Sequence, residues 1–452
     1  MDVGEEMEFV DEEGEDVEDF EEFEDVEDEE DVEDVEEMQQ SDVPVTPGTY
    51  LPGQPLAHDE HLVCDESAYK MYHQAQTGAP CLSFDLLPDK LGDDRTEYPM
   101  TCYLVSGTQA ERAHVNNIIV MKMSNLHGTN QQNEECDDDD DDDDDDEKDP
   151  ELETALIKHN GSINRIRATV LGNNHFVATW SDTGKVHLWD LSRPLEAVNN
   201  SDVMAVYTRN EESPSPVFTF SGHLVEGFAV DWSHITPGQL ATGDCSKYIH
   251  VWKLQDGGTW HVDQRPFVGH TASVEDIQWS PNEATVFASC SVDKSIRIWD
   301  IRSSPSKACM LTTEEAHERD VNVISWNRHE PFIISGGDDG IIKVWDLRQF
   351  QKGKPVALFK HHTAPITSVE WHPSDSTVFG ASGSDDQITL WDLAVEKEND
   401  ACDETEPDVP PQLLFIHQGQ TDIKEVHWHP QLTGVMISTA HSGFNIFRTI
   451  SV

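Results

Sequence analysis

Hydrophobic and polar residues alternate in short runs along the second half of the chain, and many of these runs end in tryptophan. The runs VEDIQW, VNVISW and ITSVEW end at Trp279, Trp326 and Trp371. About 20 residues after each, a second alternating run ends in Trp-Asp, as in SIRIWD at Trp299 and IIKVWD at Trp345. Because side chains of a strand point alternately to two faces, this pattern predicts short strands and an all-β fold.

The runs belong to a repeat that begins with histidine. His223, His270, His317 and His362 are 47, 47 and 45 residues apart, and looser copies follow His159 and His417. A period of about 45 residues with short strands and a terminal Trp-Asp is typical of WD40 propellers. The strand-like runs MTCYLVSG, NNIIVMKM and LETALIK precede His159 and supply one more repeat. The sequence therefore predicts a seven-bladed WD40 β-propeller over residues 96–452.

Residues 66–90 have no repeat character. The segment ESAYKMYHQAQ (66–76) is predicted to be an N-terminal helix that ends before Gly78 and Pro80. The last repeat lacks a fourth strand, because the chain ends soon after FNIFRT. We expect Cys81 to Pro88 to supply that strand and close the ring, which would remove exposed sheet edges.

Acidic residues are concentrated in two segments. The chain has 89 acidic and 29 basic residues, a net charge of -60. Residues 1–37 hold 24 acids, and residues 134–149 hold 14, including ten consecutive aspartates; 89 − 38 leaves 51 acids against 28 basic residues elsewhere. Self-repulsion prevents such segments from forming a core. We predict an acidic disordered tail over 1–45 and an acidic disordered loop over 130–150 that interrupts the first blade.

This charge balance argues against several classes of partner. Nucleic acids and anionic membranes attract clustered Lys and Arg, which are missing here, and no apolar run is long enough to span a bilayer. The N-terminus lacks the basic and apolar pattern of a signal peptide. Eight cysteines without metal or disulfide spacing indicate a reducing compartment and buried free thiols. A basic protein is the expected partner.

Some residues resemble catalytic or metal-binding sets. His270, Ser289 and Asp293 could suggest a catalytic triad, but His317, Ser335 and Asp339 repeat the same spacing. Since a triad is needed only once, we interpret the two sets, each with its tryptophan, as structural hydrogen-bond chains. The two sets comprise His270, Ser289, Asp293 and Trp299, and His317, Ser335, Asp339 and Trp345.

His427 and His429 alternate along a predicted strand, but the Trp-His-Pro phrase around them also occurs at Trp371, which favours the repeat over a metal pair. The aspartate run lacks the spaced ligands of a calcium loop. No phosphate-binding loop, nucleophile elbow or zinc motif is present. We therefore expect a non-enzymatic, monomeric binding protein without metal, cofactor or catalytic residues.

The blades GHLVEGFAVDW and GHTASVEDIQW, together with ESAYKMYHQAQ and CLSFDLLPD, resemble the histone-binding WD-repeat proteins of chromatin-assembly complexes. The resemblance covers about residues 66–452. The glutamate-rich tail, the aspartate insert and LATGDCSKYIHVWK most resemble the glutamate-rich WD-repeat branch. That branch is associated with ribosome biogenesis as a chaperone for ribosomal protein L three, and animal members are also described as histone binders.

The resemblance implies two binding surfaces. The loop 395–412, VEKENDACDETEPDVPPQ, followed by LLFIHQG, resembles the acidic loop that forms a groove with the N-terminal helix in the histone-binding proteins. Its acids would meet basic side chains, the prolines would hold its shape, and the apolar run would form the floor; the alternative is a solvated, untargeted loop. The groove residues are Asp403, Glu404, Glu406, Asp408, Pro410, Pro411, Leu413, Leu414 and Phe415.

The second surface is the narrow face of the ring, where the inner strands begin. Here Ser162, Pro365 and Thr367 depart from the histone-binding pattern, which argues against an identical ligand. The acids on this face can also be interpreted as solvated rim charges. The residues that keep the family's character are Arg165, Glu226, Phe228, Glu275 and Asp320.

Taken together, these features predict a chaperone for a basic client, most directly a ribosomal protein of the L three type in large-subunit assembly. A histone-binding scaffold is the main alternative, and a substrate adaptor of a ubiquitin ligase is a lesser one, because propellers serve many functions. The expected location is the nucleus and nucleolus, with capture of a new client in the cytoplasm.

Overall fold

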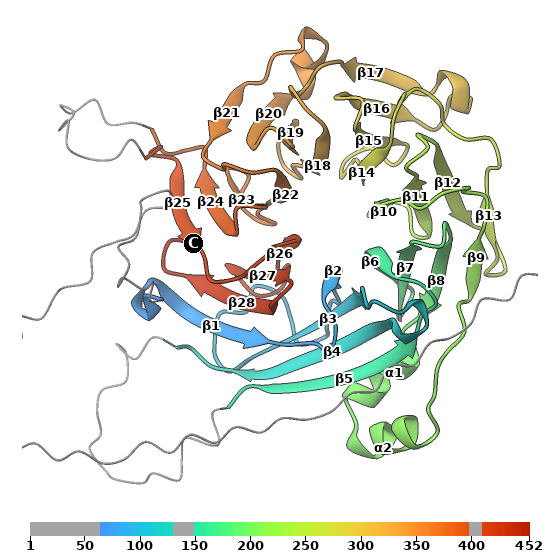
Figure 1. The fold of residues 1–452 in the computed structure, drawn as a ribbon, viewed down its shortest axis with the longest axis vertical. Helices are drawn as coiled ribbons and strands as arrows, with labels where there is room; N and C mark the ends of the chain where they lie inside the picture. The colour runs from blue at the N-terminus through green and yellow to red at the C-terminus, as the bar shows by residue number, and fades with distance from the viewer. Residues whose placement is uncertain (1–63, 130–148, 397–408) are drawn as a thin grey trace, which may run out of the picture. The chain divides into compact units, whose positions relative to one another are not determined.

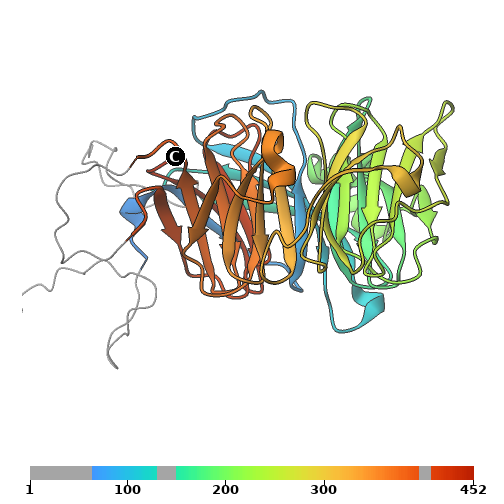
Figure 2. The same cartoon turned by 90° about the horizontal axis from the view of Figure 1, so that it is seen from above.

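The fold is a ring of seven four-stranded antiparallel sheets, which confirms the predicted seven-bladed propeller (Figure 1). The computed structural model describes residues 64–129, 149–396 and 409–452. Figure 2 shows the ring edge on, with the blades side by side. In each blade the innermost strand lies next to the centre and leads outward through hairpins. The inner strands begin at the narrow face and end at the opposite face, which we call the wide face.

The first three blades take in residues 81–262. Blade 1 contains β2 (Cys81–Leu86), β3 (Met100–Thr108), β4 (Asn117–Leu126) and β5 (Glu151–Lys158). Blade 2 contains β6 (Ile163–Leu171), β7 (Asn174–Ser181), β8 (Val186–Asp190) and β9 (Phe218–Phe220). Blade 3 contains β10 (Ala229–Trp232), β11 (Gln239–Gly243), β12 (Ile249–Leu254) and β13 (Trp260–Val262).

The next three blades follow the same plan. Blade 4 contains β14 (Val274–Trp279), β15 (Val286–Ser291), β16 (Ile296–Asp300) and β17 (Cys309–Thr313). Blade 5 contains β18 (Val321–Trp326), β19 (Phe332–Gly337), β20 (Ile341–Asp346) and β21 (Ala357–Lys360). Blade 6 contains β22 (Ile366–Trp371), β23 (Val378–Gly383), β24 (Gln387–Asp392) and β25 (Leu413–His417).

Blade 7 joins the two ends of the described chain. It contains β26 (Glu425–Trp428), β27 (Val435–Ala440), β28 (Gly443–Thr449) and, as its outer strand, β1 (Tyr69–Ala75). Cys81–Leu86 is instead β2, the inner strand of blade 1, where Phe84 pairs with Ser106 of β3. The prediction that Cys81–Pro88 closes the last blade was therefore wrong, because the preceding segment takes that place.

The predicted helix over 66–76 was also wrong. Only the 3-10 turn η1 (Glu66–Ala68) is helical, and the rest is β1, in which Tyr72 pairs with Phe447 of β28. Tyr69 and Met71 are buried while the residues after each are less so, which is the period of a strand. Backbone pairing to β28 satisfies the donors and acceptors that a helix would have satisfied internally.

Two short helices lie outside the ring between β8 and β9 (Figure 1). They are α1 (Ser192–Val198) and α2 (Ser201–Arg209), and Val198 and Tyr207 pack against the outer part of blade 1. The other short turns are η2 (Ala113–Val115), η5 (Pro305–Lys307) and η6 (Leu347–Lys352). Among the described residues, no helix has the length and apolar character needed to cross a membrane.

The aspartate-rich insertion falls within blade 1, as predicted. The strands on either side of it, β4 and β5, are paired, with Ser124 opposite Glu151. Most of the predicted loop (residues 130–148) and the whole predicted tail (1–45) lie outside the described residues.

The histidine, serine and tryptophan side chains of blade 4 form a continuous hydrogen-bond chain. His270 Nδ1 lies 2.9 Å from Asp293 and its Nε2 lies 2.7 Å from Ser289 Oγ, which also accepts from Trp299 Nε1 at 2.8 Å. Blade 5 repeats the chain with His317, Ser335, Asp339 and Trp345 at 2.8 to 3.1 Å. These buried chains join three strands within a blade, which is a structural role.

Free thiols are found among the described cysteines, but burial is only partial. Cys81, Cys102 and Cys290 are buried, Cys245 and Cys309 are half-buried, and Cys64 is exposed. The expectation of buried thiols therefore holds for the three that lie in strands next to the ring's core.

Candidate binding sites

The apolar part of the predicted groove lies where β25 meets β1. Leu413, Leu414 and Phe415 of β25 are all half-buried. The ring of Phe415 packs edge-on against Tyr69 of β1, with 5.3 Å between centroids. Leu414 joins the same cluster, so strand β1 takes the place in which we expected a helix.

A turn holds the near end of the acidic loop. The backbone N–H of Leu413 donates to the carbonyl oxygen of Pro410 at 3.0 Å, and Pro411 lies inside that turn. The side-chain amide of Gln412 donates to the carbonyl oxygen of Val395 at 2.9 Å. The two ends of the loop are therefore held close together. Its four predicted acids, Asp403, Glu404, Glu406 and Asp408, lie outside the described residues.

A buried histidine fixes the floor of this surface. His417 Nδ1 lies 2.7 Å from Tyr69 Oη, and its Nε2 lies 3.0 Å from the amide nitrogen of Asn445. Burial lowers the pKa of His417 to about 3, so the imidazole is neutral at physiological pH. These contacts link blade 6 to both β1 and β28 and keep the aromatic cluster rigid.

Three predicted acids of the narrow face gather at the starts of neighbouring inner strands. Glu226 precedes β10, Glu275 lies in β14 and Asp320 precedes β18. Burial raises the pKa of Glu275, and the Asp320 carboxylate raises it further. Burial likewise raises the pKa of Asp320, assisted by Asp338. Repulsion among these carboxylates favours a cation bound between them.

The other two narrow-face residues have internal contacts. Arg165 points into the centre of the ring, where its Nη1 lies 2.7 Å from Glu425 Oε1. Its Nε donates to the carbonyl oxygen of Phe228 at 3.2 Å, and Phe228 is half-buried. Arg165 therefore stabilises the inner strands instead of lying on the rim with the three acids.

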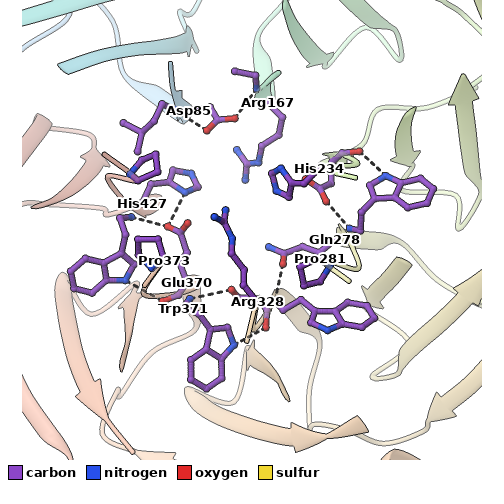
Figure 3. A pocket seen from close by; sticks show the side chains of 18 of the residues that line it. Asp85, Arg167, His234, Gln278, Pro281, Arg328, Glu370, Trp371, Pro373 and His427 are labelled. Carbon is purple, nitrogen blue, oxygen red and sulfur yellow. Dashed lines mark hydrogen bonds and ion pairs between the residues drawn. The ribbon is translucent and has the colours of Figure 1, made fainter. Parts of the chain in front are cut away.

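The centre of the ring contains a polar cavity of about 430 Å³ that extends to the wide face (Figure 3). Two layers of side chains from the seven inner strands line it. The outer layer consists of the residues two positions after each tryptophan or its equivalent. Prolines occupy four of its seven positions: Pro88, Pro281, Pro373 and Pro430. The other three are Val170, His234 and Arg328.

The next layer consists of the residues just before each tryptophan or its equivalent. They are Asp85, Arg167, Asp231, Gln278, Ser325, Glu370 and His427. Several accept a hydrogen bond from a backbone N–H of the next blade, as Asp231 does from Trp279 at 2.7 Å and Glu370 from Trp428 at 2.9 Å. Burial raises the pKa of Asp231 to about 8. This layer therefore joins neighbouring blades around the cavity.

A buried ion network joins three blades across the ring closure. Glu425 of blade 7 is 1% exposed and pairs with Arg165 and, at 2.5 Å, with Arg167, both from blade 2. Its other oxygen accepts from the backbone N–H of Phe84 in blade 1 at 2.9 Å. Burial would raise the pKa of Glu425, but the two arginines and His427 hold it well below its usual value. Glu425 is thus ionised and fully partnered.

Comparisons with known proteins agree with this architecture. The family model of the histone-binding protein RBBP4, or the corresponding component of the CAF1 complex, matches residues 59–127. The WD domain, G-beta repeat model matches residues 262–300, 308–346 and 353–392. Each of these three matches includes the three inner strands of one blade, in blades 4, 5 and 6.

Curated relatives cover nearly the whole chain. Glutamate-rich WD repeat-containing protein 1 of Dictyostelium discoideum is 46% identical over 87% of this chain and 83% of its own length. Ribosome assembly protein rrb1 of Schizosaccharomyces pombe is 42% identical over 91% of this chain and 86% of its own length. Protein HEAT STRESS TOLERANT DWD 1 of Arabidopsis thaliana is 44% identical over 91% of this chain and 93% of its own length.

The chain belongs to the glutamate-rich WD-repeat protein family. This confirms the resemblance inferred from the tail, the aspartate insert and the blade sequences. For this family member, sequence reasoning missed the charged lining of the central cavity. The signal was present, because the residue before each tryptophan is polar or charged in DW, QW, SW, EW and HW.

His427 provides a pH test of the cavity. Burial alone would lower its pKa, but the carboxylates of Glu370, at 3.1 Å, and Glu425 raise it to about 10. A histidine pKa raised in the folded state stabilises fully below pH of about 6.5, and this contribution is lost as the pH rises toward 10. The network around His427 should therefore weaken on the alkaline side.

Urea unfolding at pH 6 and pH 9.5 measures this effect. We expect the wild-type chain to lose more free energy of unfolding between these two pH values than His427→Gln, which cannot titrate. His261→Gln, on the short strand β13 away from these carboxylates, is the matched control and should follow the wild type. Identical pH dependence in the wild type and His427→Gln would contradict the assignment of a charged His427.

Proposed function

We propose that this protein is a non-enzymatic chaperone that binds a basic protein client during ribosome assembly. The observation that carries the proposal is the similarity, over 91% of the chain, to a relative named a ribosome assembly protein. The net charge of -60 supports a basic client, because opposite charge accelerates encounter and suppresses wrong partners. A location in the nucleus and nucleolus, with capture of new client in the cytoplasm, follows from that role.

The proposed client is a ribosomal protein of the L three type, as the family resemblance implies. Its basic segment would contact the surface at β25 and β1, where half-buried Leu414 and Phe415 lie beside the end of an acidic loop. The three acids of the narrow face, Glu226, Glu275 and Asp320, form a second surface for Lys or Arg side chains. Neither surface needs a catalytic group or a cofactor.

Cross-linking mass spectrometry of the tagged native protein tests the proposal. We expect one basic ribosomal protein to be captured in near-stoichiometric amount, with cross-links to the loop 395–412 or to the narrow face. Stoichiometric capture of a histone together with chromatin-assembly subunits would instead support the second candidate. Capture of neither kind of basic protein would overturn the proposal.

A histone-binding scaffold is the second candidate function. The observation that favours it is the match of residues 59–127 to the histone-binding family model, since these residues include β1 and the whole of β2. The departures Ser162, Pro365 and Thr367 on the narrow face argue against an identical histone ligand. Quantitative pull-downs with recombinant histones and with the ribosomal protein would rank the two clients.

The acidic loop gives a specific mutational prediction. Changing Glu404, Glu406 and Asp408 together to Ala should weaken the client by tenfold or more, because each close charge-assisted contact contributes about 1.5 to 3 kcal/mol. Titration calorimetry with the purified client measures the dissociation constant.

The matched control neutralises three aspartates within 137–146, where seven equivalent charges would remain. We expect a small loss of affinity there and an unchanged melting temperature in both variants. Equal losses in the two triple variants would show that the loop contributes only bulk negative charge, and the groove would have to be abandoned.

A further inference from the structure

Arg328 is a cation without a partner at the wide-face mouth of the central cavity. Its side chain extends from the end of β18 toward the middle of the mouth (Figure 3). Its guanidinium makes no hydrogen bond or ion pair with any residue in the described ranges 64–129, 149–396 and 409–452. The other arginines of the cavity differ, because Arg165 and Arg167 are both paired with Glu425.

Two more donors lie on the same arc of the mouth, in the two preceding blades. The side-chain oxygen of Gln278 accepts from the backbone N–H of Trp326 at 2.8 Å, which leaves its amide nitrogen without a partner in the described part of the chain. The imidazole of His234 likewise has no hydrogen bond there, and burial and the nearby Arg328 lower its pKa. A neutral imidazole keeps one N–H donor.

The carboxylates that line the cavity are already engaged elsewhere. Asp231 accepts from the backbone N–H of Trp279, Asp85 accepts from that of Ala168 at 2.7 Å, and Glu370 accepts from Trp428 and pairs with His427. Each of these acceptors therefore faces a neighbouring inner strand. The mouth presents three unpaired donors on one arc, and the acids beneath it do not satisfy them.

We propose that the wide-face mouth of the cavity is a carboxylate-binding site. A guanidinium binds a carboxylate through two parallel N–H···O bonds, and neighbouring imidazole and amide N–H groups complete the four acceptor positions of its oxygens. Prolines at four of the seven lip positions give the opening a fixed shape. The cavity of about 430 Å³ accommodates an Asp or Glu side chain, or a chain terminus, entering end-on.

This site is distinct from the surfaces proposed for the basic client, which present acids. Its carboxylate can come from another protein or from the chain itself, since residues 1–37 alone contain 24 acids. A carboxylate within the same chain has the advantage of a high effective concentration. The chemistry at Arg328 is the same in both cases, so the two sources need separate measurements.

The first measurement is fluorescence anisotropy of the full chain with a fluorescein-labelled tetraglutamate peptide. We expect Arg328→Gln to raise the dissociation constant at least tenfold. Arg348→Gln is the matched control, because Arg348 is exposed and already paired with Asp346 at 2.8 Å, and it should leave the affinity unchanged. Equal binding by the wild type and Arg328→Gln would overturn a site for a carboxylate supplied in trans.

The second measurement identifies a carboxylate supplied in cis. In full-chain Arg328→Lys, a carbodiimide joins the new amine to any carboxylate in contact with it, and mass spectrometry locates the bond. A cross-link to residues 1–37 would support the site even if the wild type excluded the peptide. Cross-links confined to Asp85, Asp231 and Glu370 of the cavity wall, without Arg328-dependent peptide binding, would overturn the proposal.

Discussion

Replacing Glu425 by Gln is expected to lower the free energy of unfolding by about 3 to 5 kcal/mol. The substitution keeps the shape and the hydrogen bond from Phe84, but it removes the charge that neutralises Arg165 and Arg167. Removing one partner of a buried ion pair leaves the other charge uncompensated in a poorly solvated site, which is far more costly than losing an exposed pair. Chemical denaturation monitored by tryptophan fluorescence measures the change.

The exposed pair between Asp422 and Lys424 provides the control. These side chains are 2.6 Å apart, next to the same strand, but they are 51% and 34% exposed. Asp422→Asn should therefore change the free energy of unfolding by at most about 1 kcal/mol. Comparable losses in the two variants would mean that the Glu425 network is solvated and that it does not hold blades 7, 1 and 2 together.

Trp299→Ala should destabilise the propeller by a similar amount, about 3 to 5 kcal/mol. Trp299 is fully buried, its ring stacks on Phe287 with 6.0 Å between centroids, and its Nε1 donates to Ser289. Alanine leaves a cavity in blade 4 and removes one end of the hydrogen-bond chain that includes His270. Thermal and urea unfolding would both register the loss.

Two further variants separate packing from surface effects. Trp299→Phe keeps much of the ring's volume and loses the hydrogen bond to Ser289, so it should fall between the wild type and Trp299→Ala. Val268→Ala, at a position 42% exposed, should change stability by less than about 0.5 kcal/mol. A loss for Val268→Ala equal to that for Trp299→Ala would contradict the assignment of Trp299 to the core.

The blades could be predicted from the sequence because each one is local. The alternation around Trp279 and Trp299, and its recurrence every 45 to 47 residues, records contacts within one blade and with its neighbour. The same locality made the hydrogen-bond partners of His270 recognisable from spacing alone, since they lie 19 and 23 residues away.

The ring closure could not be predicted in the same way. Tyr69, Tyr72, His73 and Gln76 are spaced three or four apart, as on a helix, while Tyr69 and Met71 alternate, as on a strand. Pairing with β28, more than 370 residues later, decides between these two conformations. The charged lining of the cavity was missed for a related reason, because residues such as Arg328 and Glu425 come together only when the ring is closed.

The pairing of β1 with β28 also sets an order of events during synthesis. Strand β2 can pair with β3 as soon as about 30 more residues are made, so blade 1 can form early. Strand β1 must wait for the last residues of the chain, a delay of roughly 20 to 75 s at translation rates of about 5 to 20 residues per second. During that interval the nascent chain carries an unpaired strand bearing Tyr69 and Met71, and this strand is the part most exposed to wrong pairing before the C-terminus emerges.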